Sequence, residues 1–464
     1  AFQQVACTAK GIAPYYRDTI VLAIPQTLED SPLPPAQVSF SAGELDAQKL
    51  IAGDLASPQW LPTESVEDAA WVQYTFEQAQ TVRAVTLGIP ARTGFGAPPP
   101  ANAILKVSLD GLDWRPVAEL APGSAPQRTV SFAPVTAKYF RMVLEAAKSD
   151  SSTALPQPAA GIVGPPFPTP RPGYSLASFT LHGGGRVNHY ETKAGFATTR
   201  DYYTLDTVNG LKGIAKSSVV NLTSLMDANG NLDWQPPPGQ WQILRFGYSL
   251  TGHQNGPAVA QATGLEVDKL AAASVRRYLE HYLNLYRDSM GDQNNALRGL
   301  LADSIESGPQ NWTPALLEKF HHLRGYDATP WLPTLAGFVI ESSEASDRFL
   351  WDWRRTITQL VSSEYYQTLA DVAHERGLKL YSEALEDNRP QLGDDISMRS
   401  RADVPMGAMW VLPPGGEGRP TYLADVMGAA SAAHLYGRKQ VGAETFGAFL
   451  QNEISPEFIS NVGL

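Results

Sequence analysis

The stretch RGLLADSIESGPQNWTP (residues 298–314) decides the fold prediction. Apolar residues run up to Asp303, Glu306 follows three positions later, and a Gly-Pro turn comes next. A short apolar run bounded by turn residues is typical of a buried strand. The pattern therefore predicts a buried strand whose end presents two carboxylates.

The sequence on either side of this stretch, from about residue 185 onward, alternates predicted strands and helices. Helical spacing of apolar residues covers 273–290, 313–325, 346–377 and 422–437. Further strands are predicted at 241–250, 378–385, 401–410 and 439–447, with 241–250 as the first buried one. Repeated βα units favour an α/β fold with a parallel sheet, and at this length a TIM-type (β/α)8 barrel. We count about five barrel strands where closure needs eight. We therefore expect a barrel that is incomplete in this chain and further domains of a longer polypeptide.

Residues 51–185 have a different rhythm. Apolar and polar residues alternate over 71–78, 81–89, 103–111 and 138–146, which predicts antiparallel strands. The Asp110-Gly111 turn followed by Trp114 is typical of a sandwich hairpin, and the pattern resembles galactose-binding or discoidin-like jelly-roll modules. A Pro-rich segment over 155–173 follows. We expect an inserted β-sandwich that either binds sugar or acts as a structural wedge.

The predicted organisation therefore has three parts. Residues 1–50 form the N-terminal segment of the catalytic region, 51–185 the inserted module and 186–464 the catalytic barrel. The stretch YYRDTIVLAIP (15–25) supports this division, because it does not continue the pattern of the sandwich.

Composition narrows the function classes. The 464 residues carry a net charge of −11, which argues against a nucleic-acid partner because phosphate binding needs a basic face. The sequence has no apolar run of the ~18 to 20 residues that a membrane span needs. The single cysteine, Cys7, cannot form an internal disulfide.

Several catalytic motifs can be set aside. His182-Gly-Gly-Gly185 is similar to an esterase oxyanion loop, but the sequence has no G-x-S-x-G elbow. The sequence also contains no H-E-x-x-H, P-loop or Rossmann fingerprint. His321-His322 lies in a helical pattern, where a packing or surface role is expected rather than zinc binding.

Acidic residues recur around the predicted strands. They are Asp303, Glu306, Glu383, Glu386, Asp403 and Glu444. In a βα barrel the carboxyl ends of all strands open on one face, so we expect these acids to converge there. Converging carboxylates suit glycoside hydrolysis, which needs a proton donor and a base or nucleophile. They also suit calcium, which takes several oxygen ligands.

A group of motifs resembles the catalytic domain of glycoside hydrolase family 106, the bacterial α-L-rhamnosidases, over roughly residues 190–450. These motifs are DSIESGPQNWTP, RGYD (324–327), SDRFLWDWRRT, LYSEALE, GDD (393–395), DVPMGAMW, AAHLYG and GAETFG, with TGHQNGPA and GLEVDKL. The resemblance implies a (β/α)8 barrel, cleavage of terminal α-L-rhamnose with inversion, and calcium at the active site.

The resemblance also implies roles for residues. Glu306 is expected to protonate the leaving oxygen and Glu444 to activate water. Asp303, Glu383 and Glu386 are expected to bind calcium, although Glu386 is a substitute for either catalytic role. One departure is that Ala408 and Met409 stand where some relatives are expected to carry an acid, which Asp403 would replace.

Substrate contacts are expected from a further set of side chains. Rhamnose carries an apolar methyl group, which aromatic and thioether side chains can pack against. The predicted substrate-binding residues are Asn255, Asp268, Trp312, Asp403 and Trp410.

Two alternatives to an inverting α-L-rhamnosidase stay open at this point. One is a barrel glycosidase with a retaining carboxylate pair, and the other is a non-catalytic carbohydrate-binding protein. A carbohydrate or rhamnosylated substrate is met outside the cytoplasm, so we expect a periplasmic or secreted location.

Overall fold

The computed structural model describes residues 15–90, 101–123, 125–146, 171–199, 202–256, 258–291, 296–385, 392–410 and 420–447. The described chain divides into two compact units. The first contains 15–146, 171–252 and 316–354, and the second contains 253–315 and 355–447. None of the described helices is both long and apolar enough to cross a membrane.

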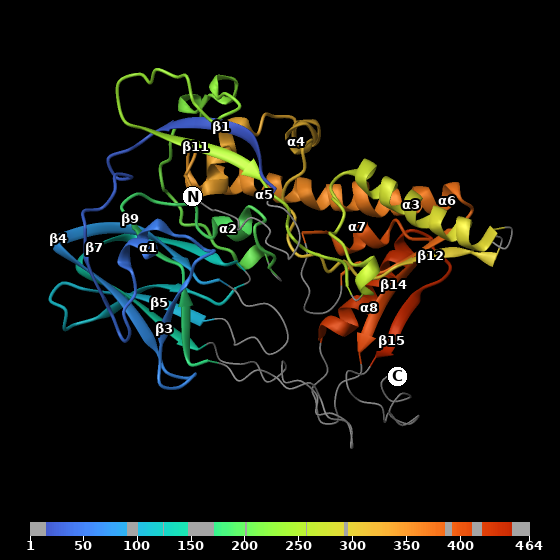
Figure 1. Cartoon of the computed structure of the whole chain (residues 1–464), viewed down its shortest axis with the longest axis horizontal. Helices are drawn as coiled ribbons and strands as arrows, with labels where there is room; N and C mark the ends of the chain where they lie inside the picture. The colour runs from blue at the N-terminus through green and yellow to red at the C-terminus, as the bar shows by residue number, and fades with distance from the viewer. Residues whose placement is uncertain are drawn as a thin grey trace. The chain divides into compact units, whose positions relative to one another are not determined.

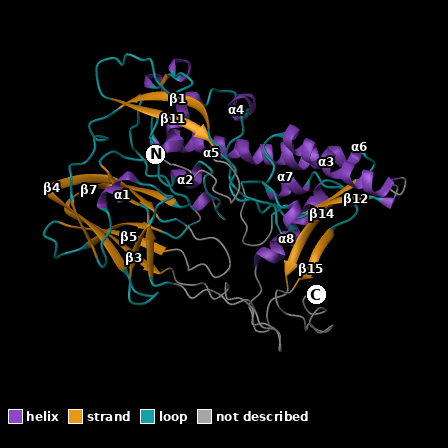
Figure 2. Cartoon of the chain, in the orientation of Figure 1, coloured by secondary structure: helices purple, strands orange, loops and turns teal. Residues whose placement is uncertain are grey.

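The first unit contains an antiparallel β-structure (Figures 1 and 2). Its main sheet has the strand order β2 (Gln37–Phe40), β4 (Ala70–Gly88), β7 (Gln127–Ala146), β5 (Ala101–Ser108), β6 (Arg115–Leu120), with β9 (Ser178–His182) also paired to β4. A second pair joins β3 (Gln59–Pro62) to β8 (Gly173–Leu176), and helix α1 is Ala47–Ala52. Along β4, Val72, Tyr74 and Phe76 point into the core while the residues between them stay partly exposed, as alternation predicts.

The structure changes the predicted strand limits here. The two strands expected at 71–78 and 81–89 are one 19-residue strand, β4, with a pairing irregularity between Thr75 and Gln80. Its partner β7 extends over 20 residues and so includes the strand predicted at 138–146. Because the irregularity absorbs the extra residues, pairing with β7 resumes beyond it and the two predicted strands form one.

The outward face of this sheet carries a cation–π stack. The Arg141 guanidinium carbon lies 4.4 Å from the ring centroid of Trp71 and 4.0 Å from that of Trp114. The Arg141 Nε and Nη2 groups both donate to Gln73 Oε1, at 3.0 and 2.7 Å. Two indole rings therefore contact the guanidinium, and the stack joins β4, β7 and the turn before β6.

A second antiparallel sheet in the first unit corrects one prediction. β1 (Arg17–Pro25) pairs with β10 (Val220–Asn221) and with β11 (Trp241–Tyr248). The strand predicted at 241–250 was expected to be a buried barrel strand, which is wrong. Its exposed residues alternate along β11, while β1 supplies the buried run Ile20–Ile24. Alternation of this kind is typical of an antiparallel strand with one solvated face.

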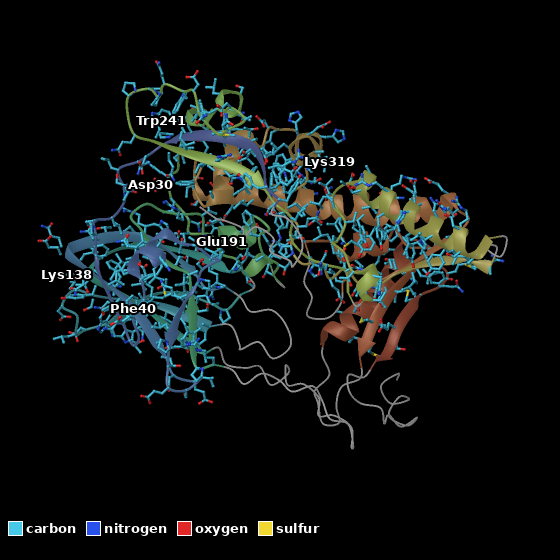
Figure 3. All side chains as sticks on the ribbon, in the orientation of Figure 1. Asp30, Phe40, Lys138, Glu191, Trp241 and Lys319 are labelled. Carbon is cyan, nitrogen blue, oxygen red and sulfur yellow. The ribbon has the colours of Figure 1, made fainter. Side chains whose placement is uncertain are left out.

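Buried polar groups tie α2 (Tyr190–Lys193) into the first unit. The carboxylate of Glu191, labelled in Figure 3, accepts hydrogen bonds from Thr129 N, Thr129 Oγ1 and Gln127 Nε2. Lys193 Nζ lies 3.0 Å from the carboxylate oxygens of Asp347 in helix α5 (Ser343–Leu360). The first unit also contains α4 (Leu316–Arg324) and the 3-10 segments η2 (Tyr202–Thr204), η3 (Lys216–Ser218), η4 (Thr223–Leu225) and η7 (Thr329–Ala336).

The second unit is built on a four-stranded parallel sheet. Its strands lie in the order β12 (Gly299–Ala302), β13 (Lys379–Ser382), β14 (Val404–Trp410), β15 (Gly442–Gly447). The helices of this unit are α3 (Ala272–Met290), α6 (Gln367–Glu375), α7 (Asp395–Arg399) and α8 (Pro420–Leu435), with the 3-10 turn η5 (Ala260–Ala262). Figure 1 shows α3 beside α6, which it contacts.

The parallel strands confirm the α/β prediction in a coarser form than a barrel. The described residues contain four parallel strands where five barrel strands were counted, because β11 belongs to the other unit, and they form half of a barrel. The long helix predicted over 346–377 is confirmed in its extent, since helical residues run without a break from Ser343 to Glu375. The π-helical turn η8 (Val361–Tyr366) separates α5 from α6.

Candidate active site

Three carboxylates meet at the carboxyl end of the parallel sheet. Asp303 directly follows β12, Glu383 directly follows β13, and Glu444 lies in β15. One carboxylate oxygen from each residue lies within 4.8 Å of the other two. We call Asp303, Glu383 and Glu444 the carboxylate triad.

Parallel pairing explains why the triad forms. Ala302 is paired with Ser382, so Asp303 and Glu383 leave their strands at the same level. The backbone ladder continues past the strand ends, since Glu383 N donates to Ala302 O at 3.0 Å and Ile305 N donates to Ala384 O at 3.0 Å. Sequence positions 80 apart are thereby held side by side by main-chain bonds.

The triad concentrates negative charge. Glu383 is 2% exposed, whereas Asp303 and Glu444 are exposed. Three carboxylates this close repel one another unless a cation or protons neutralise them. The donor set is all oxygen, which hard cations such as Ca²⁺ prefer, and calcium–oxygen distances of about 2.4 Å permit two ligands up to about 4.8 Å apart. The triad therefore fits one calcium ion.

Glu306 lies outside the triad, in the loop after β12. Its Oε1 accepts a hydrogen bond from Ser304 Oγ at 2.8 Å, and the side chain is exposed. Glu386, expected as a further calcium ligand or as a catalytic substitute, lies outside the described residues. Glu306 and Glu444 were expected to act as acid and base. Glu444 lies beside Asp303 and Glu383, two of the expected calcium ligands, whereas Glu306 lies in the loop after β12.

Asp268 organises that same loop. Its carboxylate accepts from Gln310 Nε2 at 2.6 Å and from Thr313 Oγ1 at 2.8 Å, and it also accepts from Leu270 N. These bonds hold the residues on both sides of Trp312, which is partly buried. Both carboxylate oxygens of Asp268 already accept hydrogen bonds from the protein. This geometry favours a structural role, in which Asp268 holds the loop that carries Trp312, over the expected substrate contact.

The remaining expected substrate contacts are placed differently. Asn255 closes its own loop, donating through Nδ2 to Ala262 O and accepting from Gly264 N. The backbone of Trp410 ends β14, and its side chain lies outside the described residues.

Asp403 corrects the expectation that all the acids share one face. It precedes β14 and accepts from Leu380 N at 2.8 Å and from His374 Nε2 at 2.7 Å. In a parallel sheet, a residue before a strand lies at the amino end, opposite to the triad. Burial raises the pKa of Asp403, but the two hydrogen bonds and the nearby cationic side chains outweigh burial and leave the pKa below its ordinary value.

A buried ion-pair network near the triad was missed by sequence reasoning. Arg399, in α7, donates through Nε to Asp395 Oδ2 at 2.8 Å and through Nη2 to Asp425 Oδ1. Burial lowers the pKa of Arg399, but the two carboxylates outweigh burial and leave it raised. Burial raises the pKa of Asp425 despite this pairing. The GDD motif at 393–395 contains Asp395, so the sequence did single out this carboxylate. The motif does not indicate that Arg399 is its partner.

Two known proteins are similar to this chain. A rhamnosidase from Novosphingobium sp. PP1Y is 42% identical and superposes with a TM-score of 0.81, covering 94% of this chain and 39% of that chain. A Formosa agariphila protein named "Putative beta-glucuronidase" is 37% identical over 236 residues, which are 50% of this chain and 19% of that protein. The chain thus spans well under half the length of each of these relatives.

A family model described as alpha-L-rhamnosidase matches residues 2–463. Because this match covers nearly the whole sequence, the chain belongs to glycoside hydrolase family 106, the alpha-L-rhamnosidases.

Proposed function

We propose that the protein is an inverting α-L-rhamnosidase that removes terminal α-L-rhamnose from glycosides or from oligo- and polysaccharides. The observation that carries the proposal is the carboxylate triad at the carboxyl end of a parallel sheet, in a chain of this family. The solved rhamnosidase, at 42% identity, supports the same substrate class. In the whole protein we propose that the half-barrel is part of a complete (β/α)8 barrel, and that the protein acts in the periplasm or outside the cell.

The triad would hold the calcium ion. Asp303, Glu383 and Glu444 supply oxygen ligands from three strands of one sheet, and Glu386 is proposed as an additional ligand. When bound, the ion would neutralise the crowded carboxylates and offer positive charge to sugar hydroxyls. Glu383 is 2% exposed, so water would screen the attraction between its carboxylate and a bound cation only weakly.

The proposed chemistry divides between two carboxyl groups. Glu306 donates a proton to the glycosidic oxygen as the bond from that oxygen to C1 breaks. Glu444 accepts a proton from water, and the water oxygen bonds to C1 from the opposite face, which inverts the anomeric centre. Asp268 would hold the Trp312 loop, so that an aromatic face is available to the apolar methyl of rhamnose.

The position of Glu444 makes its role testable. A carboxylate that binds a cation is a weaker base, because the cation favours its ionised form. If Glu444→Gln abolishes calcium binding while a slow inverting reaction persists, Glu444 acts as a metal ligand alone and the base is Glu386.

The first experiment measures hydrolysis of p-nitrophenyl α-L-rhamnoside by the whole protein, with and without a calcium chelator, for wild type, Glu306→Gln and Glu444→Gln. NMR of the first product anomer reports the stereochemistry. We expect inversion, loss of activity with chelator, and a fall in kcat of about 10²-fold or more in each variant. A retained anomeric configuration would indicate a nucleophilic pair instead. Sugar binding by a folded wild type without hydrolysis would indicate a carbohydrate-binding protein.

A further inference from the structure

We propose that Arg399 is a positioning residue for the carboxylate triad, because it fixes the chain just beyond β13 and the middle of the neighbouring strand β14, at positions that adjoin the triad. The proposal rests on the proposed function in one respect, which is that calcium is taken as the ligand of the triad. Arg399 itself lies in α7 and does not belong to the triad.

The Arg399 guanidinium contacts the main chain of β14 and of the segment that follows β13. Its Nη1 group donates to the carbonyl of Met406 in β14, and its Nη2 group donates to the carbonyl of Leu385, beyond the end of β13, at 3.2 Å. The side chain is 0% exposed. A planar guanidinium presents donors in fixed directions, so these carbonyls are held at a set separation.

Asp425 extends the network to a third point. Its Oδ1 pairs with Arg399, and its Oδ2 accepts from Ala408 N in β14 at 2.8 Å. β14 is thus held from both sides of Gly407, at the Met406 carbonyl and at the Ala408 amide. Asp395 completes the set, because its Oδ2 accepts from Arg399 Nε and its Oδ1 accepts from Leu385 N.

The held positions adjoin the triad. Leu385 lies two residues after Glu383, and Ala384 between them accepts the backbone hydrogen bond from Ile305, two residues after Asp303. Ala408 is the register partner of Glu444 across the β14–β15 pair. A displacement of Leu385 or Ala408 would therefore move the ligand carboxylates, and a metal site tolerates displacements of only a few tenths of an ångström.

α8 approaches the network closely at one glycine. A Cβ at Gly428 would lie 2.7 Å from Asp395 Oδ2 and 3.5 Å from Arg399 Nε. Gly428→Ala should therefore displace the Asp395 carboxylate while keeping every charge of the network. It provides a second test beside a substitution of Arg399 itself.

The test is calcium affinity, measured by titration calorimetry on the whole protein at 25 °C. Arg399→Lys keeps the positive charge but cannot reach two carboxylates and two carbonyls together. We expect its calcium affinity to fall about 10- to 100-fold, the usual effect of losing a group that orients metal ligands. Gly428→Ala should weaken calcium binding several-fold, in a protein that circular dichroism shows to be folded.

The control is Lys193→Met, which removes a buried cation of the first unit, paired with Asp347. It should lower thermal stability and leave calcium affinity unchanged. If folded Arg399→Lys binds calcium within twofold of wild type, the proposal is wrong. If that variant does not fold, unchanged affinity in Gly428→Ala overturns it.

Failure of the proposed function gives a different result. A wild type that binds no calcium removes the metal site and this inference together. A wild type that binds calcium, with variants that bind it equally well, removes the positioning role alone. A merely structural role for Arg399 would lower the unfolding temperature at constant calcium affinity.

Discussion

Glu191 gives the first unit a pH-dependent stability that can be measured. Its carboxyl group is 1% exposed and accepts three hydrogen bonds, from Thr129 N (3.1 Å), Thr129 Oγ1 (2.6 Å) and Gln127 Nε2 (3.0 Å). Burial raises the pKa of Glu191 from 4.5 to about 7, and the hydrogen bonds only partly oppose this rise. The perturbation is Glu191→Gln, which preserves the shape of the side chain and removes its titration.

The magnitude follows from linkage. A pKa difference of about 2.5 between the folded and unfolded states corresponds to roughly 3 kcal/mol. Because the folded state binds the proton more tightly, this stabilisation is fully present below pH 4.5. It is lost as the pH rises to the folded pKa, near 7. Across this window the free energy of unfolding of wild type should therefore fall by about 3 kcal/mol relative to Glu191→Gln.

The assay is urea unfolding of wild type and Glu191→Gln at half-unit intervals from pH 4.5 to 8, following the transition of the first unit. The variant also places an amide N–H near the Thr129 N–H or Oγ1 donor, which adds a pH-independent cost, so the slope of the difference is the informative quantity. A difference that is flat within about 0.5 kcal/mol over the window would refute the reasoning.

Glu344 provides a control, because its effect on stability changes with pH in the direction opposite to that of Glu191. Glu344 accepts from Gly210 N, and hydrogen bonds of this kind lower its pKa to about 2. The stabilisation by Glu344 is present above pH 4.5 and is lost as the pH falls toward 2. Glu344→Gln should therefore show a wild-type advantage that grows with pH between 3 and 5. The same direction in both variants would point to a global effect of pH.

The remaining predictions concern packing. Tyr366→Phe should change the free energy of unfolding by less than about 1 kcal/mol, because the Tyr366 hydroxyl is buried without a hydrogen-bond partner among the described residues; a larger loss in urea unfolding would mean that the hydroxyl is bonded. Gly299→Ala should destabilise by about 1–3 kcal/mol and weaken calcium binding, since its Cβ would lie 2.9 Å from the Tyr381 ring; a neutral result in calorimetry would show that the ring moves freely. Lys193→Met should cost about 3–5 kcal/mol by leaving Asp347 without its buried partner, and an unchanged unfolding temperature would contradict this.

The parallel strands of the second unit could be predicted because their signal is local. β12 lies in an apolar run that ends at Asp303, and β13 and β15 lie in the segments predicted as strands at 378–385 and 439–447. Their direction follows from the intervening helices. The meeting of Asp303, Glu383 and Glu444 then required one more premise, which is that parallel strands end on the same face.

β11 could not be assigned correctly from the same reasoning. Its partner β1 lies more than 200 positions earlier, with Leu22 opposite Leu244. A pattern of alternating residues shows that a strand has one solvated face, but it does not identify the partner strand. The alternation itself was readable, and it should have removed 241–250 from the count of buried strands.

Asp403 and Arg399 mark two further limits of sequence reasoning. Whether an acid precedes or follows a strand decides which end of the sheet it occupies. The strand predicted at 401–410 contained Asp403, whereas β14 begins at Val404, so a shift of the strand start by three residues decides the end on which Asp403 lies. Arg399 offers no such rule, because charged residues are seldom buried and a short helix has too few turns to show a buried face. Two carboxylates compensate its burial. Asp395 lies four residues earlier in the same helix, and Asp425 lies in α8. The ligands of the proposed metal site can therefore be found from strand ends, whereas the residues that hold those ends in register become visible only when helices α7 and α8 are placed.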